Sequence, residues 1–268
     1  MKPAPFTYHR ARDVAGAVDL VTGLGPDAKY IAGGQSLVAM MNFRLARPSH
    51  LVDLGALRTE LAYVRRDGDS VRIGALTTHH EVETAGLGFL SGAMEWVGHL
   101  PIRTRGTAGG SIAHGDATAE WCLLALLLDA EIVARGPEGR RTIPAAELFL
   151  GFFSTTLEPA EIIVEIVFPR SGRRAALTEF AERRGDFATV AAAVDLETSA
   201  VVLGGVAPAP VRVPAAEAVL ASGGSFADCA EAAADAIDPP GDANGSAEYR
   251  RVLTRTLVAR ACEEADAR

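Results

Sequence analysis

Two short glycine-rich segments carry the residue types of an anion-binding site. The first is Ala32-Gly33-Gly34-Gln35-Ser36, and the second is Thr107-Ala108-Gly109-Gly110-Ser111. Each places two adjacent glycines beside a hydroxyl side chain, so that a ligand can approach the backbone N–H groups closely. Successive N–H groups form a concave nest for an anion, and a Ser or Thr hydroxyl adds a further donor. Two such loops together have the donors to hold both phosphates of one pyrophosphate.

Neither loop is one of the common nucleotide-binding motifs. The G-x-G-x-x-G spacing of dinucleotide-binding βαβ units is absent from both loops, and so is the lysine-containing phosphate loop of NTPases. A pair of glycines beside a hydroxyl is also what a tight turn without any ligand looks like. One loop taken alone is therefore weak evidence, and only the two together favour a ligand.

The elements that must position these loops are short helices and strands. Residues 11–24 have the helical spacing of apolar side chains after a capping Asp13, and residues 28–32 form a strand that leads into the first loop. The pattern after Gly86 predicts a helix to about Leu100, just before the second loop. Farther along the chain lie three strand-like runs and two helices, at 178–182, 190–196, 200–206, 226–237 and 247–267. Interspersed strands and helices predict an α+β fold.

Length and composition exclude several classes of protein. The chain has 268 residues and a formal charge of 26 − 34 = −8, which argues against a nucleic-acid partner because phosphate binding needs a basic face. Cys122, Cys229 and Cys262 are far apart, so the sequence encodes neither a disulfide framework nor a cysteine-ligated cluster. No apolar run reaches ~18 residues and the N-terminus lacks a signal-peptide pattern. We therefore expect no membrane span and a cytoplasmic location.

Several motifs around the two loops follow one another in the order of a known family. They are Lys2-Pro3-Ala4-Pro5-Phe6, Ala32 to Leu37, Leu51-Val52-Asp53-Leu54, Ile73 to His79, Ile102 to Ser111, Gly185-Asp186-Phe187-Ala188 and Tyr249-Arg250-Arg251. With these motifs the chain resembles, over nearly its full length, the FAD-binding medium subunit of molybdenum hydroxylases. That family includes carbon monoxide dehydrogenase, the bacterial nicotine, quinoline and caffeine dehydrogenases, and the flavin domain of xanthine dehydrogenase.

The resemblance implies a fold and a domain division. The FAD-binding domain, of the PCMH or vanillyl-alcohol-oxidase type, would span residues 1–172 in two subdomains of about 1–57 and 58–172. A C-terminal domain, 173–268, would hold a three-stranded antiparallel sheet and a helical bundle. The boundary falls in Pro169 to Arg174, the most loop-like stretch of the sequence.

The resemblance also implies which residues bind FAD. The two loops would cradle its pyrophosphate, Thr78 would lie near the flavin or its phosphate, and Glu120 would bind the ribityl hydroxyls. Ile163 would contact the adenine half, while Arg183 and Phe187 would lie beside the flavin ring. The complete expected set is Ile31, Ala32, Gly33, Gly34, Gln35, Ser36, Leu37, Thr78, Thr107, Gly109, Gly110, Ser111, Asp116, Glu120, Ile163, Arg183 and Phe187.

The sequence departs from the family pattern near the second loop. Pro101 stands where a Gln is common, and Ala117 replaces a Pro. Glu120 stands where the family usually has Asp, which keeps the acceptor but lengthens its reach. Trp121-Cys122 stands where the family often has an apolar residue followed by Pro. These changes bear on the exposure of the flavin and on the surface offered to a partner.

Other histidines and carboxylates suggest no separate chemistry. His79 and His80 are adjacent, so on a helix they project about 100° apart and do not share a metal easily. His114 with Asp116 and Glu120 has the groups for acid–base work, but the resemblance favours a loop that binds ribityl hydroxyls. We assign no catalytic residue and no metal ligand.

The implied function is electron transfer within a larger dehydrogenase. A molybdopterin-containing large subunit would oxidise the substrate, and a small subunit with two-iron two-sulfur clusters would pass electrons to FAD on this chain. FAD would then reduce an external acceptor, which is NAD, a quinone or dioxygen. One alternative is a stand-alone FAD-dependent oxidoreductase acting directly on a small molecule, possibly in secondary metabolism. Another is a binding module that keeps the fold without FAD, against which the intact glycines argue.

Overall fold

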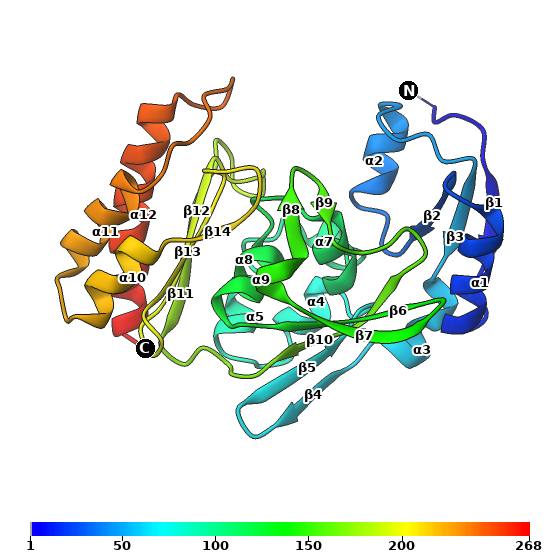
Figure 1. The fold of residues 1–268 in the computed structure, drawn as a ribbon, viewed down its shortest axis with the longest axis horizontal. Coiled ribbons are helices and arrows are strands. Elements are labelled where there is room, and N and C mark those ends of the chain that lie inside the picture. Colours follow the sequence, from blue (N-terminus) through cyan, green and yellow to red (C-terminus); the bar gives the residue numbers. More distant parts are fainter. Residues whose placement is uncertain (1) are drawn as a thin grey trace.

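Three hydrophobic cores organise the computed structural model, which describes residues 2–268. Figure 1 shows the parts built around them side by side, with the N-terminal part at the right, the middle part in the centre and the C-terminal part at the left. In the described residues no helix is both long and apolar enough to cross a bilayer.

The N-terminal part is a small parallel sheet with a helix on it. Strands β1 (Thr7–Arg10) and β2 (Ala28–Ile31) both pair in parallel with β3 (His50–Asp53). The predicted first helix is confirmed as α1 (Val14–Leu24), and the Asp13 side chain caps it by accepting from the Gly16 N–H at 2.7 Å. Its apolar stripe packs on the sheet because the buried positions recur at helical spacing.

The first glycine loop leaves this sheet at the carboxyl end of β2. It leads into α2 (Leu37–Asn42), and the chain then returns to β3. After β3 come the short helices η1 (Gly55–Leu57) and α3 (Arg58–Leu61), which connect to the middle part.

The middle part is a five-stranded antiparallel sheet covered by helices. Its order is β4-β5-β10-β6-β7, and its strands are β4 (Val64–Asp67), β5 (Ser70–Gly74), β6 (Glu131–Gly136), β7 (Gly139–Pro144) and β10 (Ile162–Phe168). The helices are α4 (His79–Glu83), α5 (Phe89–Ala93), α6 (Leu100–Arg103), α7 (Ala108–His114), α8 (Glu120–Leu127) and α9 (Ala145–Leu148). A two-stranded hairpin, β8 (Phe149–Gly151) and β9 (Ser154–Thr155), closes this part.

One predicted helix is wrong in the middle part. The stretch from Gly86 to Leu100 is α5 followed by turns, not a continuous helix. Gly86, Gly88 and Gly98 have φ of 67°, 61° and 47°, so the backbone leaves the right-handed helical region at three points. The apolar residues whose spacing predicted a helix are buried in the core of the middle part, although most of the stretch is not helical.

The C-terminal part is an antiparallel sheet buried on both faces. Its strands β11 (Ala175–Phe180), β12 (Val190–Asp195) and β13 (Ala200–Gly204) were predicted, but β14 (Val211–Arg212) adds a fourth, so the predicted three-stranded sheet was one strand short. Two residues are too few to show a strand period. Along β12 the side chains alternate: Ala191 and Ala193 face the middle core, and Ala192 and Val194 face the helices.

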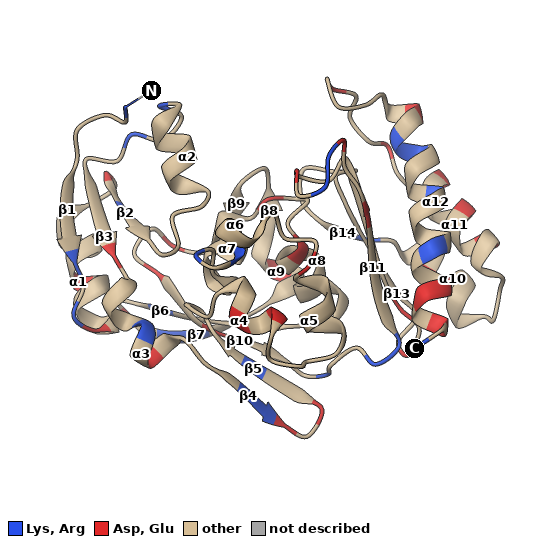
Figure 2. Ribbon diagram, turned by 180° about the vertical axis from the view of Figure 1, so that it is seen from behind, with Lys and Arg blue, Asp and Glu red and all other residues tan. Residues whose placement is uncertain are grey.

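Three helices cover the outer face of this sheet. They are α10 (Pro214–Ala221), α11 (Phe226–Asp235) and α12 (Ala247–Asp266), and the last two match the predicted pair. Helix α12 carries charged residues of both signs (Figure 2). One of its arginines, Arg250, is buried at 4% exposure.

Arg250 ties α12 to the sheet ends. Its guanidinium donates to the Thr189 carbonyl, to the Gly205 carbonyl at 2.8 Å and to the Asp242 carboxylate at 2.7 Å. Thr189 follows directly on the segment 185–188, one of the motifs that match the family. The position of that segment therefore depends on a buried cation.

We predict that Arg250→Met lowers the free energy of unfolding by about 3 kcal/mol, because it removes a buried donor from the buried Thr189 carbonyl and the part-buried Gly205 carbonyl. Urea denaturation followed by circular dichroism measures this. The matched control is Arg255→Met, which removes a guanidinium from the exposed pair with Glu231. An exposed pair contributes at most about 1 kcal/mol. Equal losses in the two variants would contradict the anchoring role of Arg250.

Candidate functional site

The two glycine loops touch each other. A Cβ atom added to Gly33 would lie 2.0 Å from the carbonyl oxygen of Arg105 and 2.9 Å from the Cα of Gly106. No side chain fits in that space, so only glycine allows the first loop to reach the start of the second. The contact brings a loop of the N-terminal sheet against the helical layer of the middle part.

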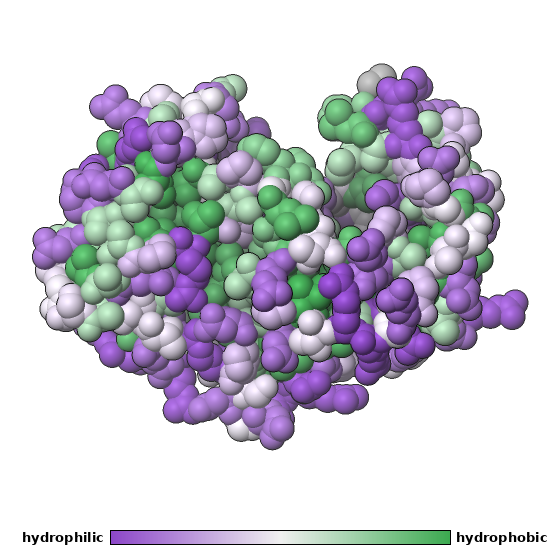
Figure 3. Space-filling model, in the orientation of Figure 1, coloured by the Kyte–Doolittle hydropathy of each residue, from purple (hydrophilic) through white to green (hydrophobic). Residues whose placement is uncertain are grey.

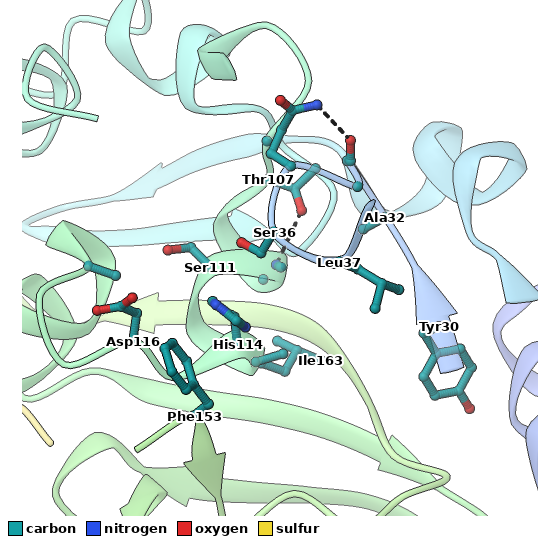
Figure 4. A pocket seen from close by; sticks show the side chains of 18 of the residues that line it. Tyr30, Ala32, Ser36, Leu37, Thr107, Ser111, His114, Asp116, Phe153 and Ile163 are labelled. Atoms are coloured by element: carbon teal, nitrogen blue, oxygen red, sulfur yellow. Dashed lines mark hydrogen bonds between the residues drawn. The ribbon is translucent and has the colours of Figure 1, made fainter. Parts of the chain in front are cut away.

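Both loops lead into a short helix, and Ala108 to Ser111 of the second loop already form the first turn of α7. The second loop begins α7, and the Thr107 hydroxyl caps it by accepting from the Gly110 N–H at 3.2 Å, as the dashed line in Figure 4 shows. The first loop begins α2 at Ser36, whose hydroxyl makes no capping bond. Gln35 braces the first loop by donating to the Gly33 carbonyl at 3.2 Å. The Ser36 and Ser111 hydroxyls lie on one wall (Figure 4), and in the described residues the N–H groups of 33–36 have no backbone acceptor. In the second loop the N–H groups of Ala108, Gly109 and Ser111 donate to backbone carbonyls, so the Ser111 hydroxyl is its donor toward the cleft.

A cleft of about 650 Å³ runs along this wall, between the N-terminal and middle parts. Figure 3 shows the molecule hollowed on that side, to the right of its middle. Its lining includes Lys29 and Tyr30 of the N-terminal part and Gly185 and Phe187 of the C-terminal part. Its size is typical of a site for a small organic ligand.

The cleft brings together most of the residues predicted from the sequence. The lining includes Ile31, Ala32, Gly33, Gly34, Gln35, Ser36, Leu37, Thr107, Gly109, Gly110, Ser111, Asp116, Glu120, Ile163 and Phe187. Thr78 and Arg183 are not among the residues that line it.

Thr78 and Arg183 have other surroundings. The Thr78 hydroxyl is buried and caps α4 by accepting from the Glu81 N–H, and its backbone bridges that of Thr107. Thr78 therefore fixes the start of the second loop through its backbone, without lining the cleft. The Arg183 side chain is 80% exposed and pairs with Asp186 at 2.9 Å.

Carboxylates gather on the wall beyond the second loop. Asp116 accepts hydrogen bonds from the Thr118 N–H and hydroxyl, both at 2.8 Å. Burial, with a smaller contribution from the charge of Asp116, raises the pKa of Glu120 to about 7. Burial and the charge of Glu120 also raise the pKa of Glu179 on β11, and its Oε1 atom has no hydrogen-bond partner. Glu120 therefore changes protonation near neutral pH and can accept or donate toward hydroxyl groups.

The sequence did not single out some aromatic residues in the cleft. Phe153 lines it with a φ of 49°, a left-handed backbone that an aromatic residue rarely adopts, and His114 stacks on its ring at 4.8 Å between centroids. Figure 4 shows both rings beside Asp116. Two adjacent phenylalanines in a turn, Phe152-Phe153, were the available signal. In the described residues no three His, Cys, Asp or Glu side chains are grouped so as to hold a metal.

The fold and this cleft define a class of flavin-binding protein. Residues 4–171 match the model for the FAD binding domain in molybdopterin dehydrogenase, and residues 175–265 match that for the CO dehydrogenase flavoprotein C-terminal domain. The chain belongs to the family of FAD-binding subunits of molybdopterin dehydrogenases, as the sequence predicted. It is accordingly an FAD-binding oxidoreductase subunit.

Relatives match along their whole length. Subunit alpha of the 6-hydroxypseudooxynicotine dehydrogenase complex of Paenarthrobacter nicotinovorans is 41% identical, over 99% of this chain and 96% of that subunit. Carbon monoxide dehydrogenase from Hydrogenophaga pseudoflava has a chain with a TM-score of 0.93 and 35% identity, over 100% of this chain and 99% of that one. For quinoline 2-oxidoreductase from Pseudomonas putida 86 the TM-score is 0.92 and the identity 30%, with 100% and 99% covered.

We predict that Gly33→Ala weakens FAD binding at least about tenfold, because the methyl group pushes the first loop away from the Arg105 carbonyl. Titration of the flavin-free chain with FAD, followed by flavin fluorescence, measures the dissociation constant. The matched control is Gly23→Ala in α1, where an added Cβ meets nothing within 4 Å. That control should bind FAD normally and gain up to about 1 kcal/mol in stability. Normal binding by Gly33→Ala would show that the loops need not touch.

A second prediction concerns the pH dependence of stability. The pKa of Glu120 is about 7 in the folded chain and 4.5 in its unperturbed state, so between these values the folded chain binds more protons than the unfolded chain. The free energy of unfolding therefore falls as pH rises from 4.5 to 7, by up to about 3 kcal/mol from this group.

Glu120→Gln removes this fall, and urea denaturation of flavin-free protein at several pH values measures the difference. The control is the exposed Glu264→Gln, which should follow the wild-type curve. Parallel curves for the wild type and Glu120→Gln would contradict the shift.

Proposed function

We propose that this chain is the electron-transfer subunit of a molybdenum-hydroxylase-type dehydrogenase. The observation that carries the proposal is the convergence of two glycine loops on one wall of a cleft, in a chain of this family. We also keep the predicted division into an FAD-binding domain, 1–172, and a C-terminal domain, 173–268.

The residues present suit FAD. The N–H groups of the first loop, with the Ser36 and Ser111 hydroxyls, would hold the pyrophosphate, because backbone donors bind anions without adding a full charge. Asp116 and Glu120 would accept from the ribityl hydroxyls. Ile163 would lie at the adenine half and Phe187, which is 71% exposed, at the flavin. Bound FAD supplies redox chemistry in one- and two-electron steps.

Thr78 and Arg183 have different proposed parts. Thr78 would act indirectly, because its backbone bridge fixes Thr107 at the edge of the second loop. Arg183 would have to leave Asp186 to approach the flavin, and its side chain is 80% exposed.

Partner chains would carry the remaining cofactors. The relatives are a subunit of a dehydrogenase complex and medium chains of carbon monoxide dehydrogenase, names that imply multi-subunit enzymes. The three cysteines of this chain are free and buried. Cys229 and Cys262 lie against each other in the C-terminal part, and the three do not have the spacing of a cluster site. We propose a molybdopterin large subunit and a two-iron two-sulfur small subunit as partners, and NAD, a quinone or dioxygen as acceptor.

Affinity purification of the tagged full chain from its native host tests this function. We expect a complex of three kinds of chain that contains FAD, molybdenum and iron. A tagged chain that purifies alone, carries FAD and turns over a small molecule would instead support the stand-alone oxidoreductase. A chain that purifies without flavin and stays colourless after FAD addition would contradict both.

A further inference from the structure

His79 is a residue of the cleft wall to which neither the sequence motifs nor the loops assign a role. It begins α4, its side chain is buried at 4% exposure, and it borders the cleft. Its Nδ1 atom lies 2.8 Å from the indole Nε1 of Trp121, which is fully buried on α8.

The contact with Trp121 fixes the tautomer of His79. An indole N–H can only donate, so Nδ1 must be the acceptor and carries no proton. Burial, and to a smaller extent the charge of Arg103, lowers the pKa of His79 to about 4, so the ring is neutral at neutral pH. The single ring proton is therefore on Nε2, which is a hydrogen-bond donor.

The Nε2 atom lies beside the second loop. A Cβ atom added to Gly106 would stand 2.5 Å from it, and the His79 backbone N–H donates to the Gly106 carbonyl at 3.1 Å. The imidazole thus packs directly against the residue that precedes Thr107, close to where Gly33 meets Arg105.

Within residues 2–268 the His79 ring makes one hydrogen bond, from Trp121 to Nδ1, and Nε2 has no protein acceptor. The fully buried side-chain atoms without a partner in this part of the chain are Thr156 Oγ1, Glu179 Oε1 and Arg250 Nε. Nε2 is not one of them, so it reaches free space, and the space that His79 borders is the cleft. A donor held in one direction at a ligand site gains a partner when an acceptor arrives, and leaving it unpaired in a filled cleft weakens binding.

We propose that His79 is a positioning residue that donates a hydrogen bond from Nε2 to an acceptor atom of the nucleotide in the cleft, and that Trp121 sets its direction by occupying Nδ1. This inference rests on the proposed function, because FAD is the ligand. Because the imidazole is neutral, its N–H orients the ligand through a hydrogen bond without adding a charge to the site.

NMR of the full chain labelled with ¹⁵N in histidine tests the tautomer first, in flavin-free protein. We expect His79 to show a protonated Nε2 and an unprotonated Nδ1. Addition of FAD should shift Nε2 and its proton, while Nδ1 stays bonded to Trp121. A proton on Nδ1, or an Nε2 signal that does not respond when FAD is bound at saturation, would overturn the proposal.

ADP serves as a second ligand in the same experiment. A response to both FAD and ADP places the acceptor in the adenosine diphosphate half, and a response to FAD alone places it in the flavin half. Both outcomes support a nucleotide acceptor. If the Nε2 signal responds to neither ligand although both are shown to bind, the proposal is overturned.

Variants separate binding from folding. His79→Phe should raise the FAD dissociation constant about tenfold, the effect of one lost hydrogen bond, whereas His79→Gln keeps an N–H donor and should recover most of the affinity. The matched control is His80→Phe, a neighbouring histidine that does not line the cleft. Equal affinities for His79→Phe and the wild type would overturn the proposal.

Trp121→Phe covers the case in which His79→Phe does not fold. It leaves His79 in place and frees Nδ1, so the NMR signals should move toward a mixture of tautomers, with FAD affinity lowered about two- to threefold. An unchanged single tautomer would overturn the role of Trp121. If instead FAD does not bind the wild type at all, the proposed function fails, and the tautomer measured in flavin-free protein shows whether the Trp121 contact is correct.

Discussion

The contact between Gly33 and the carbonyl of Arg105 is the constraint on which the rest of the site depends. It joins two parts of the chain that have separate sheets and separate hydrophobic cores. Because a Cβ at Gly33 would stand 2.0 Å from that oxygen, the two backbones meet only without a side chain. The meeting point brings the donors of both loops to one wall, and the cleft follows that wall.

Two unrelated pieces of architecture supply these loops. The first loop leaves the carboxyl end of a parallel strand, where open α/β sheets commonly bind ligands, and the second is the start of a helix packed on an antiparallel sheet. The C-terminal part completes the cleft at Phe187, in a segment whose position is held through Thr189 by the buried Arg250. Each of the three parts thus contributes to a site that none of them contains alone.

The sequence predicted the loops because their chemistry is local. Adjacent glycines beside a hydroxyl can be recognised without knowing what faces them, and the order of motifs gave the family. Thr78 and Arg183 could not be placed in the same way, because each has a second possible partner besides a ligand. The Thr78 hydroxyl caps α4, and Arg183 pairs with Asp186. The role of His79 does not follow from its sequence neighbours, because its partner Trp121 is 42 residues away and only the fold brings them together. The strand β14 was missed because two residues show no period.

The most direct test of the account is a comparison of FAD with riboflavin as ligands of the flavin-free chain, by isothermal titration calorimetry. If the two loops hold the pyrophosphate, FAD should bind at least about 100-fold more tightly, because riboflavin lacks the phosphates and the adenine half. Equal affinities for the two ligands would mean that the loops contribute nothing to binding, and would contradict the central role given to the contact between Gly33 and Arg105.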